Sequence, residues 1–178
     1  QQDRFVVPKI SNNTKNITSL IKWRRSISHV PQNINLIDDS FKNNIAFGIL
    51  ENKIDMQLVK ECAEKAKISS FIEQKINGYE TLIGEKGINL SGGQRQRLGI
   101  ARALYLRSNV IVFDEATSAL DSNTEREVIN SIFDNNSVTL IIIAHRLSTL
   151  RNCDKIIQFE NGRIKNSGPP DLLIDENE

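Results

Sequence analysis

The sequence is poor in the features that most quickly assign a chain to a structural class. Its longest apolar run, Val138 to Ala144, is far shorter than the roughly 20 residues of a membrane-spanning helix and suits a buried strand instead. The two cysteines, Cys62 and Cys153, form neither a disulfide framework nor a metal-ligand spacing. The polar and charged residues at the start lack the pattern of a secretory signal. We therefore expect reduced thiols in the cytosol.

An excess of charge of one sign is also lacking, because 23 Lys and Arg residues balance 22 Asp and Glu residues and leave a formal net charge of +1. Since bulk charge gives no support for nucleic-acid binding, we expect no nucleic-acid partner. Hydrophobic residues make up 39% of the 178 residues, which is enough for one domain with a proper core. The only methionine is Met56 and the sequence opens on Gln1. We expect that these residues were cut from a longer protein, with N-terminal processing as the alternative.

Short strands are expected at 5–7 and 27–30, which Pro8 and Pro31 end. Helical spacing of apolar residues then dominates the sequence up to about residue 90. The clearest helix here has apolar residues at 58, 59, 62, 63 and 66, with Asp55 placed to cap its start. From Ser91 onwards helices alternate with apolar strands, and two short strands near the end flank the hairpin turn Asn161-Gly162. This order predicts an α/β fold with a mainly parallel sheet and a C-terminal antiparallel hairpin.

The remaining elements follow from the same patterns. The apolar run 110–113 predicts a strand covered on both faces. A capping-box pattern from Ser122 to Glu125 predicts the start of a helix that ends at Phe133. The other expected elements are helices at 71–76 and 94–106 and strands at 138–144, 156–159 and 163–165.

A glycine-containing segment, Leu90 to Gln94, immediately precedes one of the predicted helices. Its two glycines allow the backbone to approach a ligand closely, and the N–H groups at a helix start attract anions. Ser91 adds a hydroxyl group and Gln94 a side-chain amide. The segment is compatible with a phosphate site, and also with a serine-capped helix that has a flexible entry.

Polar residues follow two of the apolar strands directly. Asp114 and Glu115 follow the first, and ligands of open α/β sheets collect at the carboxyl ends of strands. One carboxylate there can hold Mg²⁺ through water, and its neighbour can orient a water as general base. His145 follows the second strand and could hydrogen-bond a phosphate oxygen or a catalytic water. The alternatives are two solvated acids in a turn and a structural histidine.

Together these motifs resemble those of one family, the ATP-binding cassette (ABC) ATPases. Leu90 to Gln94 reads letter for letter as the family signature LSGGQ and continues into RQRLGIARAL. Asp114-Glu115 resembles the end of the Walker B motif, and Ser118 to Asp121 resembles the D-loop. Gln32 matches the Q-loop glutamine and His145 the switch histidine. The motifs occur in the family's order, and the resemblance runs from about residue 23 to residue 168.

The resemblance implies a role for each matching residue. Glu115 would be the general base that polarises the attacking water, and His145 would contact the γ-phosphate of ATP. Asp114 would bind Mg²⁺ through water, and Gln32 would link the metal and the attacking water to a transmembrane partner.

A second nucleotide-binding domain is also implied, in a head-to-tail dimer in which Asp121 would cross the interface. The signature residues would contact ATP held mainly by that second domain; they are Ser91, Gly92, Gly93 and Gln94. The segments 41–48 and 81–87 resemble loops of exporters, where the ATPase usually follows a membrane domain on the same polypeptide and touches its coupling helices. The implied cofactors are ATP and Mg²⁺. The implied location is the cytoplasmic face of a membrane, with the inner membrane of a cell as the expectation.

The implied fold is an incomplete P-loop NTPase (RecA-like) core with a helical signature subdomain. Residues 1–35 would form the Q-loop region, 36–107 the helical subdomain, 108–168 the α/β core and 169–178 a tail. The sequence departs from the family at two places. It contains no phosphate loop of the form G-x-x-x-x-G-K-[ST], which would precede Gln1, and Pro169-Pro170 stands where Thr-His is common before the last helix.

The resemblance implies ATP binding and hydrolysis that powers export across a membrane, and two other functions stay open. A non-transport cassette ATPase of the DNA-repair type would insert long coiled coils between the Q-loop and the signature, where this sequence has a short interval without sustained heptads. A subunit that supplies only the signature half of a composite ATP site would need no phosphate loop of its own.

The absence of a phosphate loop from these 178 residues generates a prediction. Without the lysine and the backbone N–H groups of that loop, the chain lacks the main source of charge stabilisation for the β- and γ-phosphates. We expect the isolated chain neither to bind Mg-ATP tightly nor to hydrolyse it. Calorimetric titration with Mg-ATP measures this, and a micromolar affinity would contradict the prediction.

Overall fold

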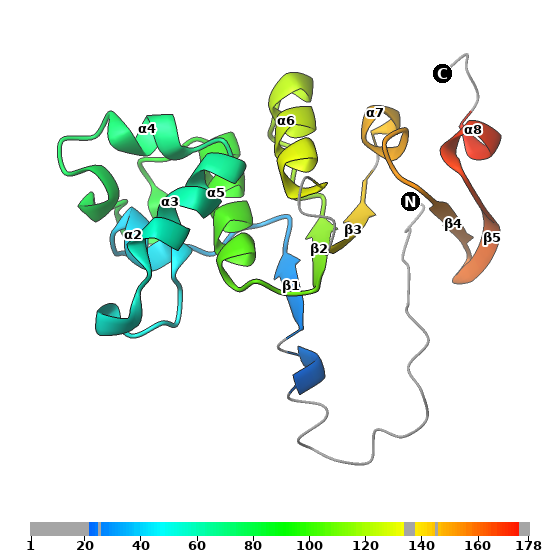
Figure 1. Ribbon diagram of the computed structural model, residues 1–178. Coiled ribbons are helices and arrows are strands. Elements are labelled where there is room, and N and C mark those ends of the chain that lie inside the picture. Colours follow the sequence, from blue (N-terminus) through cyan, green and yellow to red (C-terminus); the bar gives the residue numbers. More distant parts are fainter. Residues whose placement is uncertain (1–21, 25, 134–137, 145, 175–178) are drawn as a thin grey trace.

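The computed structural model describes residues 22–24, 26–133, 138–144 and 146–174. Four helices gather at one end of the molecule, three strands lie in the middle, and a two-stranded hairpin with a short helix lies at the other end (Figure 1). Among these residues no helix combines the length and the apolar character that crossing a membrane requires. The elements are β1 (Ile27–Val30), α2 (Phe41–Ile45), α3 (Met56–Lys65), α4 (Ser69–Glu73), α5 (Gly92–Tyr105), β2 (Val110–Asp114), α6 (Ser122–Phe133), β3 (Thr139–Ile143), α7 (Leu147–Leu150), β4 (Ile156–Glu160), β5 (Arg163–Gly168) and α8 (Pro170–Leu173).

Both sheets have the predicted arrangement. Strands β1, β2 and β3 pair in that order and are all parallel, with Asp114 at the end of β2 opposite Ile143 at the end of β3. Strands β4 and β5 form an antiparallel hairpin. Its turn residues Asn161 and Gly162 have φ values of 50° and 73°, the left-handed conformation that a two-residue hairpin turn requires. The predicted α/β fold with a parallel sheet and a C-terminal hairpin is therefore confirmed.

One face of the parallel sheet carries the core. Ile111 and Phe113 of β2 are fully or almost fully buried and belong to one cluster with Leu98 of α5 and Val128 of α6. The other face of β2 is only half-buried in the part of the chain that the structure describes, as at Val112. The prediction that this strand is covered on both faces was thus wrong for these residues, because helices α5 and α6 cover a single face.

The starts of two helices test the capping predictions. Asp55 caps α3 as predicted, since its carboxylate accepts hydrogen bonds from the backbone N–H groups of the second and third helical residues. The capping box predicted from Ser122 to Glu125 was wrong. Asp121 caps α6 instead and accepts from the backbone N–H of Thr124, while the Glu125 side chain turns into the core. The reason is that Glu125 has buried hydrogen-bond donors within reach.

Helix α5 is held close to the loop that follows β1. A side chain at Gly99 would meet the Ile34 side chain at 2.6 Å, so the loop lies directly against the helix there. Asn44, which is fully buried, accepts from the backbone N–H of Ile37 and donates to the Ile37 and Ser40 carbonyl groups. Arg102 of α5 donates to both the backbone carbonyl and the side-chain oxygen of Asn44. These contacts fix the loop on the signature helix.

The buried amide of Asn44 generates a stability prediction. Asn44→Ala removes the partners of several buried backbone groups and of Arg102, so the free energy of unfolding should fall by about 2–4 kcal/mol. Urea unfolding followed by circular dichroism measures the change. Asn52→Ala, at an exposed asparagine, is the matched control and should stay within about 0.5 kcal/mol of the parent. A loss below about 1 kcal/mol for Asn44→Ala would contradict this account.

Candidate functional site

The acids that follow β2 lie at the carboxyl edge of the parallel sheet. The backbone N–H of Glu115 donates to the Ile143 carbonyl at 3.0 Å, which extends the pairing of β2 and β3 by one residue. Asp114 and Glu115 therefore lie beside the residues that leave β3, as the sequence predicted. Glu115 has a φ of 49°, a left-handed conformation that is uncommon for a residue with a side chain and often found at functional positions. His145, the third predicted residue of this edge, lies outside the described residues.

Gln32 reaches the same edge from β1. Pro31 ends that strand, and the Gln32 side-chain amide then donates to a carboxylate oxygen of Glu115 at 2.5 Å. The two residues are separated by 83 positions in the sequence. The structure thus brings together the predicted Q-loop glutamine and the predicted general base.

A neighbour of Asp114 was not predicted. His29 pairs with Val112 in the sheet register, and its Nε2 atom lies 3.8 Å from a carboxylate oxygen of Asp114. Both side chains are about half-exposed, so any ion pair between them contributes little to stability. Side chains two residues apart in a strand point to the same face of the sheet. Because His29 pairs with Val112, it shares a face with Asp114, and this alternation could have revealed the contact.

Oxygen atoms dominate this edge of the sheet. Carboxylates of Asp114 and Glu115 and the amide oxygen of Gln32 are hard ligands, the kind that Mg²⁺ prefers while it keeps several of its waters. Within the described ranges no cluster of three or more His, Cys, Asp or Glu side chains could enclose an ion. The donors of Asp114, Glu115 and Gln32 are thus of the chemical type that suits Mg²⁺.

The signature segment forms the start of α5 through a capping box. The Ser91 hydroxyl accepts from the backbone N–H of Gln94 at 3.2 Å, and the Gln94 side-chain oxygen accepts from the backbone N–H of Ser91 at 2.8 Å. This is the serine-capped helix that the sequence left open as an alternative. Contact of the same groups with a nucleotide stays a prediction.

Packing within the chain is tight at Gly93 and ordinary at Gly92. A Cβ atom at Gly93 would lie 3.0 Å from the Ala119 carbonyl oxygen, and one at Gly92 would lie 3.4 Å from the Ala119 side chain. The start of α5 therefore presses against the loop that follows Glu115. Sequence reasoning explained both glycines by the approach of a ligand, and the structure adds close packing as a second reason for Gly93.

Gln96 joins α5 to that loop and was missed in the sequence. Its side chain, which is 5% exposed, donates to the Ser118 hydroxyl at 3.0 Å and to the Glu115 carbonyl at 3.4 Å. Its oxygen accepts from the Ala119 backbone N–H at 2.8 Å. The available signal was its position on the apolar stripe of the helix, four residues before the buried Ile100.

Asp121, the predicted dimer-interface residue, is exposed and caps α6. The Thr124 hydroxyl donates to its carboxylate at 2.7 Å, and this bond and the Thr124 backbone N–H hold the pKa of Asp121 below its ordinary value. Asp121 is therefore an anion at neutral pH with a fixed orientation. Its role across an interface stays a prediction.

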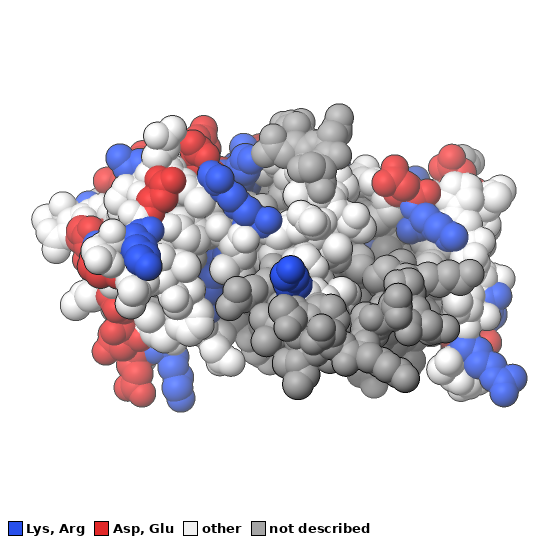
Figure 2. Space-filling view, turned by 60° about the horizontal axis from the view of Figure 1, so that its bottom comes forward, with Lys and Arg blue, Asp and Glu red and all other residues white. Residues whose placement is uncertain are grey.

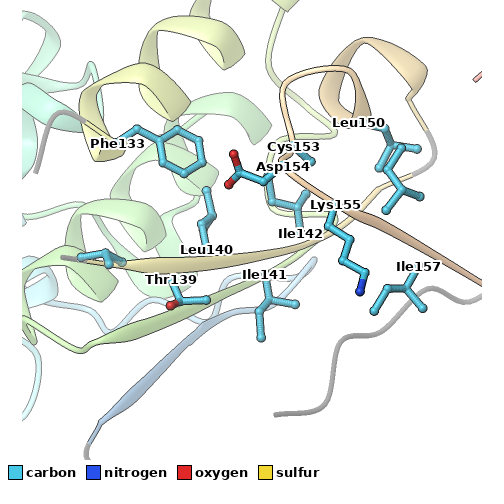
Figure 3. Close-up of a pocket in the computed structure, with 12 residues that line it drawn as sticks. Phe133, Thr139, Leu140, Ile141, Ile142, Leu150, Cys153, Asp154, Lys155 and Ile157 are labelled. Atoms are coloured by element: carbon cyan, nitrogen blue, oxygen red, sulfur yellow. The ribbon is translucent and has the colours of Figure 1, made fainter. Parts of the chain in front are cut away.

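A cavity of about 300 Å³ lies along β3, but it is not this site. Its walls come from β3, β4 and the segment between them, with Leu140, Ile142 and Ile157 among the side chains that line it (Figure 3). None of the predicted site residues that the structure describes lines it. On the face of the molecule turned forward in Figure 2, Lys and Arg side chains are interspersed with Asp and Glu over the described surface.

Comparison with known proteins identifies relatives of this chain. The family described as ABC transporter matches residues 8–118. The ATP-dependent lipid A-core flippase of Hahella chejuensis is 45% identical over 89% of this chain and 27% of its own length. The protein of the same name from Francisella tularensis is 43% identical over 92% of this chain, again 27% of its own length. A solved structure of a bacterial Atm1-family ABC exporter with ATP bound superposes with a TM-score of 0.80 at 38% identity, covering 86% of this chain and 27% of that one. The chain thus spans about a quarter of the length of these relatives.

The capping box at Ser91 generates a prediction about stability. Ser91→Ala removes the acceptor for the Gln94 N–H and should lower the free energy of unfolding by about 1 kcal/mol. Ser91→Asp keeps an acceptor at the cap and should leave the free energy of unfolding within about 0.5 kcal/mol of the parent. Urea unfolding of both variants beside Ser70→Ala, an exposed serine inside α4, measures the difference. Equal stability of Ser91→Ala and Ser91→Asp would show that the cap contributes nothing.

Proposed function

Because this chain belongs to the ABC transporter family, we propose that it forms part of the ATPase of an exporter, which binds and hydrolyses ATP to drive transport across a membrane. The observation that carries the proposal is the hydrogen bond between Gln32 and Glu115 at the carboxyl edge of the parallel sheet. It couples the loop after β1 to the acid that the family resemblance assigns as general base.

Glu115 accepts a proton from the attacking water in this proposal, and Asp114 holds the Mg²⁺ of Mg-ATP through water. When bound, the metal and nucleotide supply the phosphoryl group and the positive charge that stabilises its transfer. Gln32 orients the Glu115 carboxylate through the hydrogen bond and senses whether the site is filled. His145 contacts the γ-phosphate, a role that rests on the resemblance alone.

The signature residues act on a nucleotide held by a second domain. In this proposal Ser91, Gly92, Gly93 and Gln94 face the γ-phosphate of a partner in a head-to-tail dimer, where a helix start favours an anion. Asp121, held as an anion beside Thr124, crosses the same interface.

The membrane partner docks on the helical end of the molecule. Leu82, in the segment that resembles an exporter loop, is 67% exposed, and the backbone on either side of it is pinned by hydrogen bonds to residues 39 and 41. An exposed apolar side chain on a fixed backbone fits contact with coupling helices of a membrane domain. In this proposal the chain lies at the cytoplasmic face of a membrane, on the same polypeptide as its membrane domain. The chain alone is inactive, because its 178 residues hold no phosphate loop.

A chimeric exporter tests the function. In it, the 159 residues of this chain that match the Hahella chejuensis relative replace the matching segment of that protein, and the rest of the relative is kept. The chimera should hydrolyse ATP in proteoliposomes. Glu115→Gln should lower kcat by at least about 100-fold, because the amide cannot accept the proton, with a much smaller effect on KM.

Glu127→Gln is the matched control, since Glu127 lies on the exposed side of α6 with 62% of its side chain accessible. It should leave kcat unchanged. A chimera that folds but does not hydrolyse ATP, or one in which Glu115→Gln retains the parent rate, would contradict the proposal. If the isolated chain raises the ATPase rate of a relative that carries a phosphate loop, a signature-half subunit is the better explanation.

A further inference from the structure

Helix α6 carries a buried carboxylate that the proposed chemistry does not use. Glu125 is 4% exposed and lies among Thr117, Thr149 and Arg146. A charge removed from water in this way is costly unless donors surround it. An apolar side chain of similar size would fill the same space. Packing alone therefore does not explain why a carboxylate lies here.

Three donors from two different segments converge on this carboxylate. The Thr117 hydroxyl donates to Oε1 at 2.6 Å, and the Thr149 hydroxyl donates to the same atom at 2.7 Å. A guanidinium nitrogen of Arg146 lies 3.4 Å from Oε2. Short hydrogen bonds from a hydroxyl group to a carboxylate are among the stronger and more directional hydrogen bonds. Both threonines are themselves at most 5% exposed, so water does not compete for these bonds.

The two segments that Glu125 joins are the ones that flank the predicted catalytic residues. Thr117 lies two positions after Glu115, and Arg146 and Thr149 follow position 145. Arg146 also donates to the carbonyl groups of Ser118 at 2.7 Å and Leu120 at 2.9 Å. The loop after β2 and the segment after β3 are thus clamped to each other, and Glu125 is the only side chain of the described residues that these three donors share.

Glu125 also borders a cavity beside Glu115. A cavity of about 150 Å³ is lined by Glu115 and Ala144 as well as by Glu125, Arg146 and Thr149. The clamp therefore lies directly behind the edge where the proposed reaction takes place. A change in Glu125 is transmitted through Thr117 to the strained backbone of Glu115, whose left-handed conformation needs support from its surroundings.

We infer that Glu125 is a positioning residue for ATP hydrolysis, which fixes the loop that carries Glu115 relative to the segment that follows position 145. The inference rests on the proposed function. It assigns Glu125 no contact with nucleotide. Its effect is on the geometry of the chemical step, so that loss of the clamp lowers kcat and leaves nucleotide affinity largely intact.

Variants in the chimeric exporter separate positioning from stability. Thr149→Val keeps the shape of a side chain that is 2% exposed but removes one donor, and it should lower kcat by about 10-fold or more with KM for ATP changed less than about threefold. Thr149→Ser restores the hydroxyl and should recover most of the parent rate. Glu125→Gln keeps an acceptor for the threonines but presents an amide to Arg146, so a smaller loss is expected than for Glu125→Leu. Glu127→Gln serves again as the control on the same helix.

Rates are to be expressed per folded protein, with the folded fraction taken from urea unfolding of each variant. If Thr149→Val and Glu125→Gln keep the parent kcat, or if every loss of rate follows the loss of folded protein, Glu125 is merely structural and the inference fails. Should Glu125→Leu not fold, the pair Thr149→Val and Thr149→Ser still decides the question. A chimera whose activity does not depend on Glu115 overturns the proposed function instead, which keeps the two failures distinguishable.

Discussion

The parallel register of three strands is the constraint on which the rest of this structure depends. Because β1, β2 and β3 run in one direction, their carboxyl ends meet at one edge, and residues far apart in the sequence become neighbours there. Gln32 and Glu115 form a hydrogen bond only because Val30 pairs with Phe113. A shift of one residue in this pairing would turn Asp114 towards the opposite face of the sheet.

Buried polar side chains then hold the loop after β2 from two sides. Gln96 binds it from the signature helix, and Glu125 binds it from α6. Each of these side chains is at most 5% exposed, so each hydrogen bond forms without competition from water. The loop that carries Glu115 is consequently fixed to the helix that presents Ser91.

The signature segment illustrates how one set of residues can serve the fold and the proposed function together. Ser91 and Gln94 satisfy the first N–H groups of α5 through a capping box, and Gly93 lets the helix start approach Ala119. A helix start built in this way is rigid before any ligand arrives. Rigidity of this kind lowers the cost of ordering a contact with a nucleotide, so the structural and the proposed roles support each other.

The sequence by itself determined the α/β order of elements, the hairpin at Asn161-Gly162 and the acids at the end of β2, because these depend on local periodicity and turn chemistry. It also indicated the family, since the signature LSGGQ, the end of the Walker B motif and the D-loop are each contiguous in the sequence. Only the tertiary structure decided that β2 is covered on one face, that Asp121 rather than Ser122 caps α6, and that Glu125 is a buried acceptor. The physical reason is that burial and hydrogen-bond partners come from segments distant in sequence, as Thr149 does for Glu125.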